Sequence, residues 1–194
     1  MYKCSMPIGI DQSSSSPPQK ELSLVGAFIL ALLRDGRGMT LYELKSIAMI
    51  PTGASLPALR KLMAKGMIEA QGEKVGQKLY YISPRGRQTF EKVWFSFARR
   101  PARDLGEALR SAFLPYALGK MDLAAECLRE AARARESRAT ALERGNVPAG
   151  APVAETFEVA YSKVKSTSLQ AEAYALRALA KEIHGSKSPQ DAEE

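Results

Sequence analysis

The chain has 194 residues, 45% of them hydrophobic, and a formal net charge of +7 at pH 7. This length and apolar content suffice for one compact domain or two small ones, which excludes a wholly disordered chain. The longest apolar run, residues 24–33, is shorter than the roughly 20 residues of a membrane helix, so we expect no membrane span.

The positive charge is concentrated in the first half of the chain. Residues 1–100 contain 15 Lys and Arg against 7 Asp and Glu, a net charge of +8, whereas residues 101–194 contain 13 against 14, a net charge of −1. This segregation favours a nucleic-acid-binding surface in the first half, although a basic face can also serve only to keep a protein soluble. Cys4 and Cys127 are far apart in the sequence, which indicates neither a disulfide framework nor a metal site and fits a cytoplasmic protein.

The first predicted elements are an arm and two helices. Residues 1–20 are rich in Ser and Pro, which predicts a flexible arm. Residues 22–34 would be apolar around most of the circumference of a helix, which predicts a buried helix that forms the floor of a domain. Thr40 and Glu43 have the spacing of a capping box, which predicts a second helix. This helix has the position at which the first helix of a helix-turn-helix crosses the sugar-phosphate backbone. Its inward residues are expected to be Leu41, Leu44 and Ile47, and its outward candidates for DNA contact are Tyr42 and Lys45.

A short basic helix is predicted over residues 55–65, after a turn at 48–53. Ser55 is expected to be its N-cap, with Pro57 in the first turn and Gly66 as the stop. No acidic residue stands between positions 51 and 68, so the outer face is positive and suits a major groove about 12 Å wide. The expected core side consists of Leu56, Leu59, Leu62 and Met63, and the expected DNA contacts are Thr52, Ser55, Arg60, Lys61 and Lys65.

Two strands are predicted next, over residues 67–71 and 78–83, with a glycine-flanked tip at 72–76. This hairpin would reach a phosphate or a minor groove. Tyr80 and Tyr81 point to opposite faces of the sheet, so one is expected in the core and the other near DNA. The candidate contacts of the hairpin are Lys74, Gln77 and Lys78.

The order of these elements resembles the PadR family of transcriptional regulators. The Tyr-Glu-Leu of the family's second helix is matched by Tyr42, Glu43 and Leu44. Its recognition segment is matched by Ser55, Leu56, Pro57, Leu59 and Leu62, followed by Gly66, with Leu56 where the family commonly has tyrosine. Its wing is matched by Lys78, Tyr80, Ile82, Ser83 and Gly86. The resemblance implies a DNA-binding winged helix-turn-helix, which we place at residues 21–100.

The second half of the chain has a helical pattern throughout. Helices are predicted over 87–97, 105–118, 122–144 and 153–184, with a Gly/Pro break at 145–152 and a flexible tail at 185–194. The last two helices are long and alanine-rich, and one chain has too little mass to cover both their faces. The resemblance extends to a helical dimerisation domain of the virulence-activator type, so residues 101–184 are expected to form a homodimer.

Some relatives in this family bind a small-molecule effector at the dimer interface. The aromatic residues that could serve as an effector pocket or dimer interface here are Trp94, Phe97, Phe113, Tyr116, Phe157 and Tyr161. Simple core packing is the alternative reading of aromatics at helical spacing.

The chain contains no motif of catalytic or metal-binding residues, and His184 is its only histidine, so we expect no enzymatic activity, cofactor or metal. The sequence predicts a mainly α protein with a small two-stranded wing, built from an N-terminal winged helix-turn-helix and a C-terminal helical dimerisation domain. Its expected function is that of a dimeric regulator, most simply a repressor on a palindromic promoter site. The alternatives are a winged helix used for protein contact and an effector-responsive activator.

Overall fold

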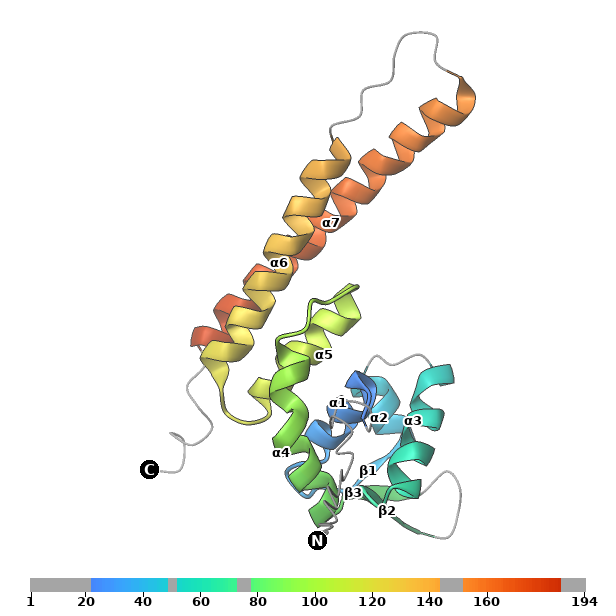
Figure 1. Ribbon diagram of the computed structural model, residues 1–194, viewed down its shortest axis with the longest axis vertical. Helices are drawn as coiled ribbons and strands as arrows, with labels where there is room; N and C mark the ends of the chain where they lie inside the picture. The colour runs from blue at the N-terminus through green and yellow to red at the C-terminus, as the bar shows by residue number, and fades with distance from the viewer. Residues whose placement is uncertain (1–21, 49–51, 73–77, 144–151, 186–194) are drawn as a thin grey trace, which may run out of the picture.

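The computed structural model describes residues 22–48, 52–72, 78–143 and 152–185. One end of the molecule contains α1 to α4 and the sheet, while α6 and α7 form a long hairpin that projects away from it (Figure 1). Among the described helices, none is long and apolar enough to cross a membrane. The elements are α1 (Leu24–Leu32), β1 (Met39–Thr40), α2 (Leu41–Ala48), α3 (Thr52–Ala64), β2 (Ile68–Gln71), β3 (Leu79–Ile82), α4 (Pro84–Ala98), α5 (Leu105–Tyr116), α6 (Met121–Glu143) and α7 (Val153–Gly185).

The mainly helical class is as predicted, but the sheet has three strands instead of two. The strands are antiparallel in the order β1-β3-β2, with Met39 opposite Tyr80 and Ile68 opposite Ile82. β1 is only two residues long, too short for alternation to appear in the sequence. It pairs with the edge of β3 that β2 leaves open, so both edges of β3 are hydrogen-bonded.

The first hydrophobic core is built around α1. Ile29, Leu30 and Leu33 are at most 1% exposed, and the helix packs against α3, α4 and α5. A helix that is apolar on all sides is stable only when it is enclosed in this way. The buried helix predicted from residues 22–34 as the floor of the domain is therefore confirmed. Ser23 caps this helix by accepting a hydrogen bond from the Gly26 N–H at 3.1 Å.

A compact network joins the end of α3 to the start of α4. Gly66 has φ +62° and ends α3 in a Schellman motif, in which the Met67 N–H donates to the Leu62 carbonyl at 2.9 Å. The Ser83 hydroxyl donates to the Gly66 carbonyl at 2.6 Å and accepts from the Gly86 N–H at 3.1 Å. The predicted stop at Gly66 and the cap at Ser83 are both confirmed, and together they set the orientation of α3 relative to α4.

The second core lies among α5, α6 and α7. Many of its buried side chains are alanines, around Leu128 and Leu176, so these helices can approach closely. Within the α6–α7 seam, Arg135 is 3% exposed and its Nε donates to Glu172 Oε2 at 2.7 Å. Trp94 packs against both cores, so α4 and α5 form the connection between the two ends of the molecule.

Candidate nucleic-acid interface

The basic helix α3 begins at Thr52, three residues before the predicted start at Ser55. Ser55 is therefore not the N-cap, and Pro57 lies inside the helix and not in its first turn. Ser55 is 1% exposed, which leaves its side chain no open surface for the predicted phosphate contact. The burial of Ser55 thus accompanies a helix start earlier than the usual preference of Ser and Pro for helix starts predicts.

α3 has one buried and one exposed face. Leu59 and Leu62 are 2% exposed and bury the helix in the first core, whereas Met63, predicted to be in the core, is 41% exposed. The apolar stripe is rotated relative to the prediction because α3 packs against α1 along its Leu59 side. The exposed residues of α3 are Gly53, Pro57, Arg60, Lys61, Met63 and Ala64.

The cations of this exposed face are available for an anionic partner. None of the ion pairs found within the described residues involves Arg60 or Lys61. No acidic residue occurs on α3, so its outer face has an uncompensated positive charge. The small residues beside the two cations leave room for close approach to a groove.

α2 precedes α3 and presents a second set of polar side chains. Its predicted capping box is formed, because the Thr40 N–H donates to Glu43 Oε2 at 2.7 Å and the Glu43 N–H donates to Thr40 Oγ1 at 3.2 Å. The hydrogen bonds from Thr40 hold the pKa of Glu43 below its usual value. Tyr42 is 80% exposed and Lys45 is half-buried. Ile47, predicted to face inward, is 54% exposed and lies beside α5.

The sheet supplies the third part of the interface. Tyr80 is 8% exposed and belongs to the core, whereas Tyr81 lies on the other face with its ring against Gly38. A Cβ atom at Gly38 would stand 2.4 Å from Tyr81 Cζ, so this contact requires glycine. Lys78 is half-buried and directly precedes β3, at the end of the hairpin that leads to its tip. Lys74, Gln77 and the side chain of Thr52 lie outside the described part of the chain.

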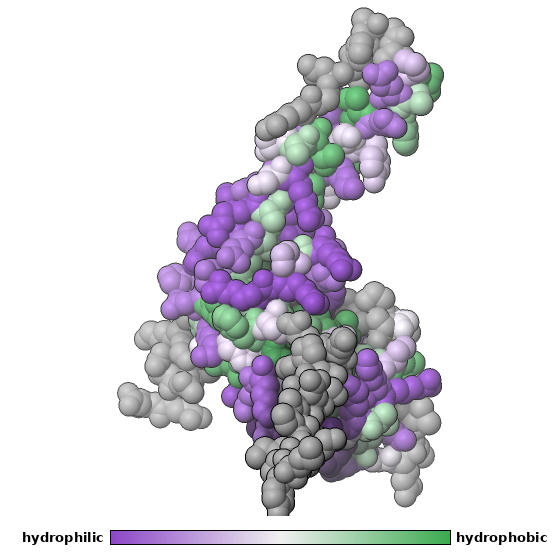
Figure 2. Space-filling model, viewed as in Figure 1, coloured by the Kyte–Doolittle hydropathy of each residue, from purple (hydrophilic) through white to green (hydrophobic). Residues whose placement is uncertain are grey.

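These elements lie together at one end of the molecule. α3 stands at its margin, with α2 behind it and the hairpin of β2 and β3 near the C-terminal end of α3 (Figure 1). Hydrophilic side chains predominate among the coloured side chains of this end in the space-filling view (Figure 2). The arrangement combines an exposed basic helix, a supporting helix and an adjacent hairpin, as in a winged helix-turn-helix.

The six aromatic residues predicted for an effector pocket or dimer interface do not form one site within the chain. Phe97 is 3% exposed in the first core, and Trp94 is half-buried between the two cores. Phe113 and Tyr116 line a cavity on α5. Phe157 and Tyr161 are 69% and 56% exposed near the start of α7, far from the other four (Figure 1).

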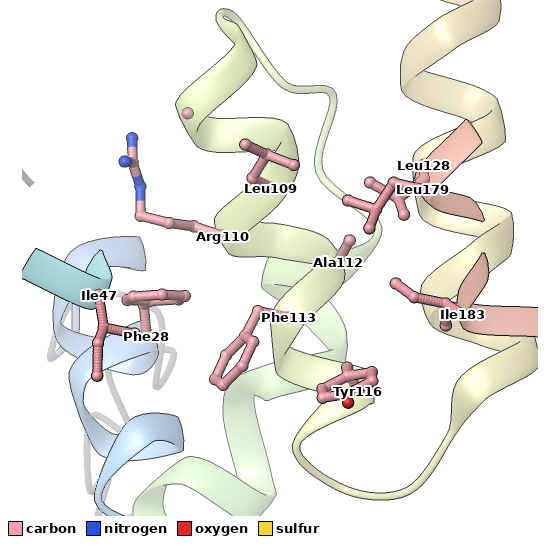
Figure 3. Close-up of a pocket in the computed structure, with 11 residues that line it drawn as sticks. Phe28, Ile47, Leu109, Arg110, Ala112, Phe113, Tyr116, Leu128, Leu179 and Ile183 are labelled. Carbon is pink, nitrogen blue, oxygen red and sulfur yellow. The ribbon is translucent and has the colours of Figure 1, made fainter. Parts of the chain in front are cut away.

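The cavity on α5 has a volume of about 310 Å³ and lies between the two cores (Figure 3). Phe28 and Ile47 stand on one side of it, and Leu179 and Ile183 stand on the other. Among the described residues, Arg110 is the one charged side chain in its lining. It is 13% exposed, its Nη2 lies 4.0 Å from Asp104 Oδ1, and its Nε has no hydrogen-bond partner. Periodicity could not reveal this cavity, because its walls come from five helices that are distant in sequence.

The thiol of Cys127 is buried and stays protonated at neutral pH. Burial, with a further contribution from the Glu130 carboxylate, raises its pKa to about 11, and Sγ lies 3.4 Å from the Ala98 carbonyl oxygen. A protonated, buried thiol is a poor nucleophile, so Cys127 acts as a small core residue. In the described part of the chain, His, Cys, Asp and Glu side chains form no group of three or more that could hold a metal ion.

The chain matches no family model and no curated protein. Among solved structures it is similar to Bacillus subtilis PadR in complex with operator DNA, with a TM-score of 0.35, 17% identity, and coverage of 81% of this chain and 99% of that one. The complex of the same protein with p-coumaric acid has a TM-score of 0.35 and 16% identity over 82% of this chain and 99% of that one. A PadR-like transcriptional regulator of Bacillus cereus has a TM-score of 0.33 and 18% identity over 84% of this chain and 99% of that one. Because these TM-scores lie below 0.5, any functional conclusion must rest on the geometry of α2, α3 and the sheet.

Proposed function

We propose that this protein is a winged-helix DNA-binding transcriptional regulator. The single observation that carries the proposal is the outer face of α3, where Arg60 and Lys61 are exposed without an acidic neighbour, opposite the buried Leu59 and Leu62. Cations on phosphates would supply affinity, and the outward residues of α3 would supply specificity in a major groove. Bound at a promoter, such a protein acts most simply as a repressor by occupying the site.

The remaining contacts follow from the elements beside α3. Tyr42 and Lys45 of α2 would contact the sugar-phosphate backbone. Lys78, with Lys74 and Gln77 further along the hairpin, would contact a phosphate or the minor groove. Lys65 and Thr52 at the two ends of α3 complete the proposed set.

Selection from a random duplex pool, followed by fluorescence anisotropy at two salt concentrations, tests DNA binding. We expect Arg60→Ala with Lys61→Ala to weaken binding by about tenfold or more and to lower the salt slope by about two, since each phosphate contact contributes about 0.9. Arg129→Ala with Arg133→Ala removes the same charge from exposed positions of α6 and should leave both quantities unchanged. The absence of salt-dependent binding to any duplex would refute the proposal.

We further propose that the protein acts as a homodimer through α7. Glu143, at the end of α6, accepts hydrogen bonds from Ser166 and Gln170, so residues 153–165 continue beyond α6 by about 20 Å. A helical segment of this length is marginal by itself in water. Its large apolar residues are nevertheless exposed, at 87% for Val153, 69% for Phe157, 56% for Tyr161 and 70% for Val164. A second copy would cover this surface, and a two-fold dimer would favour a palindromic DNA site.

The cavity on α5 supports an additional proposal, that a small-molecule effector regulates DNA binding. Its lining is apolar apart from Arg110, whose buried Nε lacks a partner among the described residues. Asp104 Oδ1 lies 4.0 Å from Arg110 Nη2, so the buried guanidinium is only partly compensated, and an apolar ligand with an anionic group would complement the cavity. The cavity touches Ile47 of α2 and Leu179 of α7, so a ligand there would contact both the DNA-binding and the proposed dimerisation elements.

A further inference from the structure

A separate groove lies along the α6–α7 hairpin, and all of the described side chains that line it are basic. Its volume is about 440 Å³. Two of the lining residues are one helical turn apart on α6, and three follow one another along the same side of α7. They are Arg129, Arg133, Arg177, Lys181 and His184.

Only part of this positive charge is neutralised by the protein. Arg177 Nη2 lies 2.6 Å from Glu136 Oε2, and His184 Nδ1 lies 3.0 Å from Asp122 Oδ1. Two lining residues of α7 therefore contact acidic residues of α6. Arg129, Arg133 and Lys181 take part in none of the ion pairs among the described residues. The groove therefore retains an excess of positive charge.

The folding of the hairpin does not account for this cluster. Arg129 and Arg133, like Arg177 and Lys181, are like charges four residues apart on a helix, a spacing that destabilises the helix. Residues 101–194 have a net charge of −1, so the cluster is not a by-product of a generally basic segment. A bound anion would relieve the repulsion within each helix and across the seam.

We propose that this groove binds a small soluble polyanion of the diphosphate or triphosphate class. Arginine guanidinium groups match phosphate oxygens in bidentate pairs, and the groove offers those of Arg129 and Arg133, with Lys181 across the seam and Arg177 already paired with Glu136. The positions from Arg177 to His184 span about 10 Å of helix, which suits two or three linked phosphates and not an extended duplex. Such a ligand joins α6 to α7, and this site is independent of DNA binding by α3.

Isothermal titration calorimetry with inorganic pyrophosphate and tripolyphosphate in physiological salt tests the assignment. The wild-type protein is expected to bind one anion per chain, and Arg129→Ala with Arg133→Ala to weaken binding at least tenfold. Lys163→Ala with Lys165→Ala, on the same hairpin, and Arg60→Ala with Lys61→Ala, on α3, should both retain wild-type affinity. Lys181→Ala provides a second test if the double arginine variant loses helical content.

Three outcomes would overturn the proposal. The first is no saturable binding of either anion by the wild-type protein. The second is an equal loss of anion affinity in the α7 control, since the anion would then bind non-specifically, or a loss of anion affinity only in the α3 variant, since the anion would then bind at the proposed DNA interface. The third concerns the variant Arg129→Ala with Arg133→Ala. If it binds duplex DNA more weakly but binds pyrophosphate as the wild type does, the groove contacts DNA phosphates instead.

Discussion

At the residue scale, Gly86 lets two helices pack closely because it has no side chain. A Cβ atom at this position would stand 2.0 Å from the Met67 carbonyl oxygen, a backbone atom that also accepts a hydrogen bond from the Ser83 N–H at 3.0 Å. The approach of α4 to the end of α3 is possible only because this atom is absent. Gly86 also matches the glycine of the PadR wing pattern, and the structure gives that match a steric reason.

Gly86→Ala is therefore expected to destabilise the protein by about 2–3 kcal/mol, because overpacking against backbone forces the α3–α4 junction apart. Urea unfolding followed by circular dichroism measures the change. Gly53→Ala is the matched control, since a Cβ atom there meets nothing within 4 Å and the residue is helical. The control should be neutral or stabilising by up to about 1 kcal/mol. Equal stability of the two variants would show that the α3–α4 contact is looser than described.

At the scale of elements, α7 has two apolar seams on opposite faces. The seam through Ala173, Leu176 and Ala180 is buried against α6, whereas the seam through Phe157, Tyr161 and Val164 is exposed. Both seams repeat at alternating spacings of three and four residues, as in a coiled coil. The side chains of the exposed seam are larger than those of the alanine-rich seam that packs on α6.

We predict that Phe157→Ser with Val164→Ser weakens the proposed dimer about a hundredfold or more, since each buried side chain of this size contributes about 1.5–3 kcal/mol. Sedimentation equilibrium measures the dissociation constant, and circular dichroism checks that the helices persist. Tyr174→Ser is the control, because Tyr174 is 78% exposed on α7 but lies off the seam. A monomeric wild-type protein, or equal weakening by Tyr174→Ser, would rule out this interface.

At the scale of the whole molecule, α5 connects the two cores. It packs against α1 and α4 on one side and α6 on the other, and the cavity of about 310 Å³ lies along its surface. Ile47 of α2 and Ile183 of α7 both line this cavity (Figure 3). A ligand that changes the distance between Ile47 and Ile183 would couple the proposed DNA binding to the position of the α6–α7 hairpin. The ligand must then change the affinity for DNA by the same factor as DNA changes the affinity for the ligand.

The cavity is predicted to bind 2-naphthoate more tightly than the neutral 2-naphthol, because only the carboxylate can pair with Arg110. Arg110→Ala should weaken 2-naphthoate binding about tenfold and leave 2-naphthol binding unchanged, as measured by calorimetry. If the cavity regulates the protein, 2-naphthoate should also change the affinity for the selected duplex by the same factor as DNA changes the affinity for 2-naphthoate. Equal binding of the two compounds to the wild-type protein would contradict the role of Arg110.

By itself, the sequence determined the elements whose signals are local. The capping box of Thr40 and Glu43, the stop at Gly66 and the cap at Ser83 each depend on atoms within a few residues, and all three are formed as predicted. The absence of acidic residues from α3 could also be read from the sequence, because the charge of a segment depends only on its own residues. These signals sufficed for the helix order, the hairpin and the position of the basic helix.

Only the tertiary structure decided which faces are buried and which distant residues meet. The rotation of α3 that exposes Met63, the strand β1, and the Arg135–Glu172 pair depend on contacts between segments far apart in the chain. The same holds for the cavity beside Arg110 and for the basic groove of α6 and α7. A local pattern records how apolar or charged a helix face is, but what covers that face depends on the packing of the whole chain.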